Sequence, residues 1–296
     1  MLREGGMDTK SGLEYFAPYI VYSESPPADL RQVILDPTNA SNAEPVLIVM
    51  YPQGSWAPSG HPPGGALFYA YPFGDGVPIS YTEATLEYDV YLPPDFEFIK
   101  GGKLPGLGGG PRGCGGGVDP IDCWSVRVMW RREGAGEAYM YVPEGHQGAD
   151  FCDQPPRTKC DYHAGVSLSR GAFYFQPGQW HHIALTVQMN DVGQANGVVE
   201  IRVNGERKIY YNQVAYRTKP GIQVDSVVFS TWYGGGDATW SPTEETFTLF
   251  KNIQLYRTGS PIAEKASGVE GQAVEAAAAA QPVVVTLPLE DIEPQY

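Results

Sequence analysis

The chain has 296 residues, which is enough to bury a sizeable core, and its 36 glycines, 26 prolines and 19 tyrosines predict many short strands joined by loops. No apolar run has the length of a membrane span, and the first residues, MLREGGMDTK, lack the hydrophobic stretch of a secretory signal. The net charge of −14, with no extended basic stripe, argues against nucleic acid or a membrane as a partner.

Three segments are predicted along the chain. Residues 1–45 are polar and interrupted by proline, so we expect an N-terminal extension with one possible strand at FAPYIVY. Residues 46–258 contain recurring strand patterns, which predict one all-β domain of two antiparallel sheets packed face to face, a jelly roll. Residues 259–296 are expected to form a C-terminal tail, in which VVVTLPL is either flexible or adds a strand to a sheet edge or to a partner.

The segment YDVYLPPDFEFIKGGKLPGLGGG, residues 88–110, predicts a strand that ends at Pro93 and Pro94. A Gly-rich loop is expected to follow and to carry the cation Lys103. The preceding strand holds Glu87 and Asp89, an i, i+2 carboxylate pair that keeps a glycoside hydrolase open as an alternative.

Charge is distributed unevenly along the chain. Residues 259–296 hold six acidic residues and one lysine, whereas residues 100–132 hold six basic and two acidic residues. Because charges are screened over a Debye length of about 8 Å at physiological salt, the local field governs what a cleft binds. The region 100–132 is therefore expected to attract an anion.

Residues 124–142, WSVRVMWRREGAGEAYMYV, alternate apolar and polar residues on both sides of a Gly-containing turn and predict a β-hairpin. With a three-residue loop at 133–135, Arg127 lies opposite Tyr141. Four polar side chains then share the face of the hairpin away from the core, namely Ser125, Arg127, Tyr139 and Tyr141. A four-residue loop would instead put the polar residues of the two strands on opposite faces. The alternative is an ordinary solvated strand face.

The four cysteines fall into two close pairs, although three connectivities are open. We expect disulfides between Cys114 and Cys123 and between Cys152 and Cys160, because no C-x-x-C spacing and no histidine at ligand spacing indicates a metal site. Disulfides indicate an oxidising destination, so the protein is expected to be extracellular, either secreted or associated with a virion or cell wall. A removed leader or indirect export would reconcile this with the missing signal.

The segment QPGQWHHIALTVQM predicts a strand with Ile183, Leu185 and Val187 on one face and His182 on the other. His182 is therefore a candidate to reach a cleft and contact substrate. The alternative is that the Trp180 to His182 group caps an edge of the sandwich.

Several separated motifs carry a family resemblance. GGKLPGL, then S-x-R at Ser125 and Arg127, then Y-x-Y at Tyr139 and Tyr141, resemble polysaccharide lyase family fourteen, the alginate and glucuronan lyases. Further similarity lies in YPQGSWAPSGHPPGGALFYAYP, RGAFYFQPGQWHHIALTVQMN and FSTWYGGGD, so the resemblance spans roughly residues 46–258. It implies a jelly roll that cleaves an acidic polysaccharide by β-elimination. No metal or other cofactor is expected, because the sequence shows no ligand cluster and Arg127 with Lys103 would replace a metal.

The resemblance also implies roles for individual residues. Elimination requires a cation on the uronate carboxylate, a base for the C5 proton and an acid for the departing oxygen. Arg127 and Lys103 suit the first role, Tyr139 and Tyr141 would divide the other two, and Ser125 would orient the carboxylate or a hydroxyl. A less favoured division makes Lys103 the base, which requires a strongly lowered pKa.

Two further residues are candidates for the flanking subsites. Arg170 and Tyr233 are expected either to contact neighbouring sugars or to pack at the sandwich edge. A non-catalytic carbohydrate-binding jelly roll is the alternative function, because a fold does not fix an activity.

Overall fold

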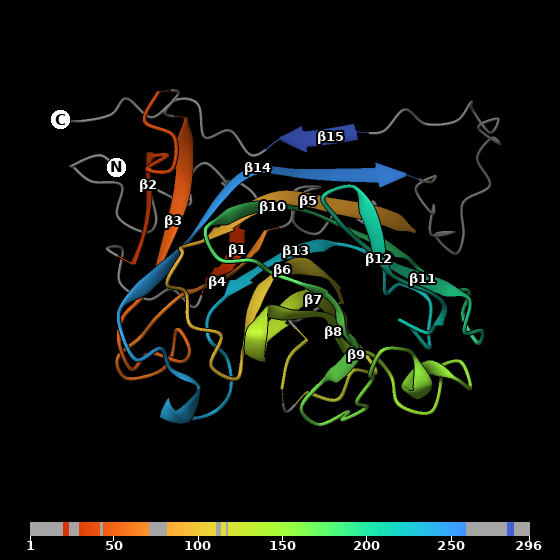
Figure 1. The fold of residues 1–296 in the computed structure, drawn as a ribbon. Helices are drawn as coiled ribbons and strands as arrows, with labels where there is room; N and C mark the ends of the chain where they lie inside the picture. The colour runs from red at the N-terminus through yellow and green to blue at the C-terminus, as the bar shows by residue number, and fades with distance from the viewer. Residues whose placement is uncertain are drawn as a thin grey trace.

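The computed structural model describes residues 20–23, 30–41, 44–70, 82–110, 114–116, 118–258 and 283–286. Two antiparallel sheets pack face to face, and Figure 1 shows the sheet that contains β14, β10 and β5 above the sheet that contains β13, β6, β7 and β8. The predicted all-β sandwich is confirmed.

The seven-stranded sheet has the order β1-β4-β13-β6-β7-β8-β9. In chain order, its strands are β1 (Ile20–Ser23), β4 (Ala66–Ala70), β6 (Gly101–Gly109), β7 (Trp124–Arg131), β8 (Ala135–Tyr141), β9 (Val166–Tyr174) and β13 (Ser226–Thr231). Within the described residues, short 3-10 turns lie at Arg132–Gly134, Phe151–Asp153 and Ala238–Trp240.

The eight-stranded sheet has the order β12-β11-β10-β5-β14-β3-β2, and β15 also pairs with β14. In chain order, its strands are β2 (Arg31–Leu35), β3 (Pro45–Tyr51), β5 (Glu83–Leu92), β10 (Gln179–Gln188), β11 (Gly197–Val203), β12 (Glu206–Val214), β14 (Thr246–Thr258) and β15 (Val283–Thr286). β2 and β15 lie outside residues 46–258, yet both pair with this sheet. The boundaries at 46 and 258 stay predictions.

The core lies between the sheets, because most strands send alternate side chains inward. Along β5, for example, buried and half-buried residues alternate without exception. The largest fully buried side chains include Trp124, Trp130, Tyr88 and Phe68. Each such side chain contributes roughly 1.5–3 kcal/mol through burial, which makes the sandwich a rigid support for groups on its outer faces. In the described part of the chain, no helix is long and apolar enough to cross a membrane.

The Gly-rich segment that carries Lys103 is a strand, β6, and not the predicted loop. Its glycines allow close packing: a Cβ at Gly102 would lie 2.2 Å from the Trp130 ring, and one at Gly106 would lie 2.0 Å from the Val126 carbonyl oxygen. The register shifts between Lys103 and Gly106, where Pro105 has no N–H to donate. Lys103 therefore projects from the middle of a sheet.

The hairpin of β7 and β8 forms with a register two residues away from the predicted one. Its loop is the turn Arg132–Gly134, so Arg127 pairs with Tyr139, and Ser125 pairs with Tyr141. The reason is backbone conformation, since a three-residue hairpin loop favours positive φ at its last position. Gly134 takes that position with a φ of 78°, whereas the predicted loop would end at Ala135, whose φ is −58°. The loop still has three residues, so the predicted parity holds and the four polar side chains share one face.

Candidate active site

A cavity of about 810 Å³ lies over the outer face of the seven-stranded sheet, the face turned away from the core. Its floor comes from β4, β6, β7, β8 and β9, and surrounding loops supply its walls. Cations dominate its described lining, which includes Lys100, Lys103, Arg127, Arg131, Arg157, Lys159 and Arg170 against one acid, Asp161. The local positive charge predicted for this region is therefore concentrated in one cavity, although the chain as a whole is acidic.

Arg127 lines this cavity and is only 3% exposed. Its Nη2 donates two long hydrogen bonds of 3.4 Å, one to the Cys114 carbonyl and one to Ser125 Oγ. Its Nε has no hydrogen-bond partner, and it forms no ion pair within the described residues. A buried guanidinium without a carboxylate is costly, so this side chain is prepared for an anion that arrives from outside.

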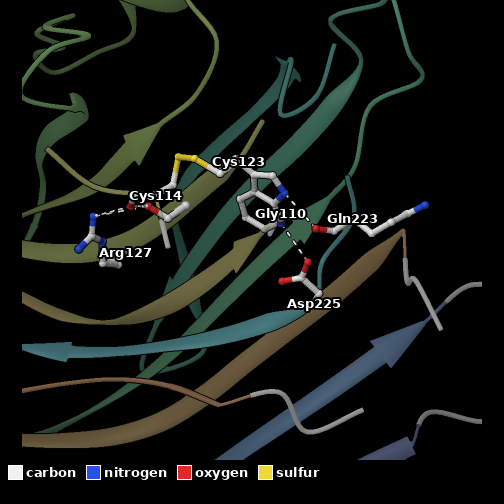
Figure 2. The surroundings of a disulfide bond; sticks show 8 residues. Gly110, Cys114, Cys123, Arg127, Gln223 and Asp225 are labelled. Carbon is white, nitrogen blue, oxygen red and sulfur yellow. Dashed lines mark hydrogen bonds between the residues drawn. A yellow bond between two sulfur atoms is a disulfide. The ribbon is translucent and has the colours of Figure 1, made fainter. Parts of the chain in front are cut away.

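The Cys114 carbonyl orients both polar residues of the S-x-R motif. Ser125 Oγ donates a 2.8 Å hydrogen bond to this oxygen, and Figure 2 shows the Arg127 guanidinium directed at the same group. Ser125 is fully buried and lies outside the cavity lining, so it supports Arg127 from behind. Cys114 is fixed by a disulfide to Cys123, and Cys152 pairs with Cys160, which confirms both predicted bridges.

Loss of the Cys114–Cys123 bridge is expected to lower turnover. Replacing both cysteines by serine frees the carbonyl that orients Arg127, and misplacement of a catalytic group by about 1 Å can cost up to about a hundredfold in rate. Steady-state kinetics, with thermal unfolding measured in parallel, checks this. The matched variant without Cys152 and Cys160 should chiefly raise KM, because its loop carries Arg157 and Lys159. Equal kcat losses in the two variants would contradict the assignment.

Lys103 extends into the cavity between two aromatic rings. Its Nζ lies 4.8 Å from the Trp232 ring centroid and 5.6 Å from the Tyr139 ring centroid. Burial, together with the nearby positive charges of Arg127 and Arg131, lowers the pKa of Lys103 to about 7, and Glu137 opposes this shift. At neutral pH a substantial share of this amine is therefore neutral and able to accept a proton.

The two tyrosines stand side by side, with their hydroxyl oxygens 3.1 Å apart. Both hydroxyls donate to the Ala164 carbonyl, at 3.0 Å from Tyr141 and more closely from Tyr139. A phenolate cannot donate to a carbonyl, so each hydroxyl carries its proton in this arrangement. Burial raises the pKa of Tyr139, followed in size by the effect of Tyr141, although Arg127 and Arg131 act in the opposite direction. Both groups are held as proton donors.

Glu137 belongs to the site and is missing from the residues expected there. It is 0% exposed, and its two carboxylate oxygens bind Arg131 and Arg170. The sequence contained a usable signal, because Glu137 lies two residues before Tyr139 and so faces the same side of β8. Arg170, which was expected, does line the cavity.

Two expected site residues lie elsewhere, and both expectations are corrected. Tyr233 is 1% exposed and packs in the core against Phe96 and Trp130, so it does not contact a ligand in the cavity. His182 lies on β10, on the outer face of the other sheet, where its side chain is 41% exposed and Nδ1 lies 2.8 Å from Asp89 Oδ1. Alternation placed His182 on an outer face correctly, but it does not indicate which sheet a strand joins.

The carboxylate pair considered for hydrolysis lies beside His182 and away from the cationic cavity. Asp89 also accepts a 2.6 Å hydrogen bond from Asn252, and Glu87 Oε2 lies 3.9 Å from His182 Nε2. Within the described chain, no group of three or more His, Cys, Asp or Glu side chains is arranged to hold a metal ion.

The chain is similar to proteins of known structure and to one curated protein. It is 33% identical to the marine PL-14 alginate lyase of Aplysia kurodai, with a TM-score of 0.72 over 83% of this chain and 92% of that one. The alginate lyase vAL-1 from Chlorella virus shares the fold, with 21% identity and a TM-score of 0.62 over 77% of this chain and 90% of that one.

The curated relative is exolysin of Paramecium bursaria Chlorella virus 1, which is 27% identical over 192 residues. This match covers 57% of the present chain but only 29% of exolysin. The family described as Polysaccharide lyase 14 matches residues 39–253, which is most of the chain and includes every residue of the cavity described above. The chain therefore belongs to the polysaccharide lyase 14 family, as its motifs predicted.

Proposed function

We propose that this protein cleaves a uronic-acid polysaccharide, alginate before other polyuronates, by β-elimination. The observation that carries the proposal is Arg127, a buried guanidinium without a carboxylate partner among the described residues, in a cavity whose lining is strongly cationic. The similarity to the Aplysia alginate lyase supports alginate as the first substrate to test. The intact set of Lys103, Arg127, Tyr139 and Tyr141 gives no support to a non-catalytic binding module.

The reaction needs one proton removed and one supplied. The C5 proton is weakly acidic, because the adjacent carboxylate already carries negative charge. Arg127 would neutralise that carboxylate as charge develops in the transition state. The C5 electrons then form the C4–C5 double bond, the C4–O bond breaks, and the departing oxygen receives a proton.

The protonation states in the site favour the division of roles that was less favoured from the sequence, in which Lys103 is the base. Lys103 has a lowered pKa and can accept the C5 proton as a neutral amine. Tyr139 and Tyr141 both donate to the Ala164 carbonyl, so they are protonated and suited to protonate the leaving oxygen. We therefore assign Lys103 as base and the tyrosine pair as acid.

This division predicts the direction of the pH dependence. Below pH 7 Lys103 is mostly protonated and cannot accept a proton, so kcat/KM should fall about tenfold per pH unit on the acidic side and rise as pH increases through about 7. Bound carboxylates favour the charged amine, so the corresponding limb of kcat should lie at higher pH. A pH–rate profile checks this, and a kcat/KM that decreases from pH 6 to pH 8 would contradict Lys103 as base.

The activity can be tested with a panel of alginate, glucuronan and other polyuronates. Elimination creates an unsaturated sugar at each new non-reducing end, so ultraviolet absorbance should increase with time on the true substrate. A neutral polysaccharide serves as the control, because it has no carboxylate for Arg127. No absorbance change on any polyuronate, with the protein folded by circular dichroism, would contradict the proposed function.

We also propose that the protein acts outside the reducing cytosol. The support is that all four cysteines are paired, since such bridges persist in oxidising compartments. Recovery of the active protein from the medium, a virion or a cell wall with both bridges intact is the expected result. Recovery from the cytosol with free thiols would contradict it.

A further inference from the structure

A buried carboxylate lies directly beneath the cationic floor of the cavity. Glu137 Oε1 accepts a 2.7 Å hydrogen bond from Arg131 Nε, and Oε2 accepts one of 2.7 Å from Arg170 Nε. Ser167 Oγ accepts from the Nη2 of both arginines, at 3.3 Å and 2.6 Å. Three neighbouring strands, β7, β8 and β9, therefore converge on one four-residue network.

Arg170 reaches this network through an irregularity in β9. Between two neighbouring pairs of β8 with β9, β8 has the single residue Glu137, whereas β9 has four residues. Two of these four, Ser169 and Gly171, have φ of 53° and 86°. Such a bulge turns a side chain that regular alternation would place differently. This backbone conformation brings a second arginine beside a buried glutamate. Such an arrangement indicates a built site.

The network keeps donors available to the cavity. Two guanidinium groups share one carboxylate, so the group retains net positive charge, and neither Nη1 has a hydrogen-bond partner among the described residues. Arg131 and Arg170 line the cavity, whereas Glu137 is fully covered and does not. The Arg131 guanidinium carbon lies 5.6 Å from the Tyr139 ring centroid, so the pair adjoins the reaction centre.

We infer that Glu137 is a positioning residue that holds Arg131 and Arg170 as a second carboxylate-binding subsite, for a uronate neighbouring the one that Arg127 holds. This inference rests on the proposed function, because a polyuronate presents a carboxylate on successive sugars. Because Nε and Nη2 of each arginine are engaged by Glu137 and Ser167, each keeps Nη1 for a ligand, and the two guanidinium groups together can give charge-assisted hydrogen bonds to one carboxylate.

Glu137→Gln separates positioning from simple electrostatics, because the two predict opposite signs. Loss of the negative charge makes the cavity more positive, which by field alone should tighten binding of a polyanion. Loss of the support for two arginines should instead raise KM for alginate about tenfold while kcat changes less than about twofold. The dissociation constant of an alginate hexasaccharide should rise by the same factor, measured in a Tyr141→Phe background, in which turnover is expected to be about a hundredfold slower.

Glu200→Gln is the matched control. Glu200 also bridges two arginines, Arg202 and Arg207, but on the eight-stranded sheet, so its loss should change neither KM nor the dissociation constant. If Glu137→Gln fails to fold, Ser167→Ala removes the second contact shared by both arginines and should raise KM in the same direction.

An unchanged or lower dissociation constant for the folded Glu137 variant, or for Ser167→Ala where that variant does not fold, would overturn the inference. Failure of the proposed function is a separate result: the wild-type protein would release no unsaturated product, while the hexasaccharide binding comparison would still test the subsite.

Discussion

Replacing Arg127 with alanine is expected to reduce kcat/KM on alginate by about a hundredfold to a thousandfold, the usual effect of removing a group that stabilises developing negative charge. Stability should change little, because the guanidinium forms only two long hydrogen bonds and its Nε has no partner among the described residues. Initial rates from ultraviolet absorbance, together with thermal unfolding, measure both effects. Arg127→Lys should recover only part of the activity, since an ammonium lacks the planar fork.

Arg217→Ala is the control for Arg127→Ala and is expected to lower stability without lowering turnover. Arg217 is also buried, but it donates to two backbone carbonyls, from Nε to Asn190 at 2.9 Å and from Nη1 to Ile222 at 3.0 Å. Its loss should lower the free energy of unfolding by about 1–3 kcal/mol while the folded protein keeps its kcat. An Arg127→Ala protein that is as active as Arg217→Ala would contradict the assignment of Arg127.

Tyr141→Phe is expected to lower kcat by about a hundredfold, because it removes a hydroxyl needed for proton transfer and keeps the ring in place. Tyr139→Phe should have a similar effect, since the two hydroxyls lie 3.1 Å apart and donate to the same carbonyl. The measurement is kcat at saturating alginate, over a pH range that includes neutrality.

Tyr216→Phe is the control for the tyrosine variants. Tyr216 is a fully buried phenol that donates 2.9 Å to the Val198 carbonyl, which matches the 3.0 Å bond of Tyr141, but it lies in the core away from the cavity. Both variants therefore lose a hydrogen bond to a backbone carbonyl, Tyr141→Phe also loses the contact with Tyr139, and only Tyr141→Phe should lose turnover. Near-normal kcat for Tyr141→Phe would remove that phenol from the mechanism.

The sequence was most informative where side-chain alternation alone decides the outcome. Alternation along residues 124–142 placed Arg127, Tyr139 and Tyr141 on one face, and this survived an error of two residues in the register because a shift by two preserves the face. Short cysteine spacings likewise predicted both disulfides correctly. These features depend on neighbours along the chain.

Features that depend on distant neighbours were not predicted. Glycines in β6 indicate a loop by composition, and only the Trp130 ring and the Val126 carbonyl packed against them explain why the segment is a strand. His182 has a polar-face pattern, but strand order decides that this face belongs to the other sheet. Arg170 meets Glu137 through a bulge in β9 that leaves no clear mark in the sequence.

The most direct measurement of the central claim is the mass of alginate fragments produced in water labelled with heavy oxygen. Elimination breaks the C4–O bond without adding water, so the account predicts fragments that carry a double bond, absorb in the ultraviolet and contain no label from the cleavage step. Fragments that are heavier by one labelled water and lack the ultraviolet absorbance would show hydrolysis and would contradict the account.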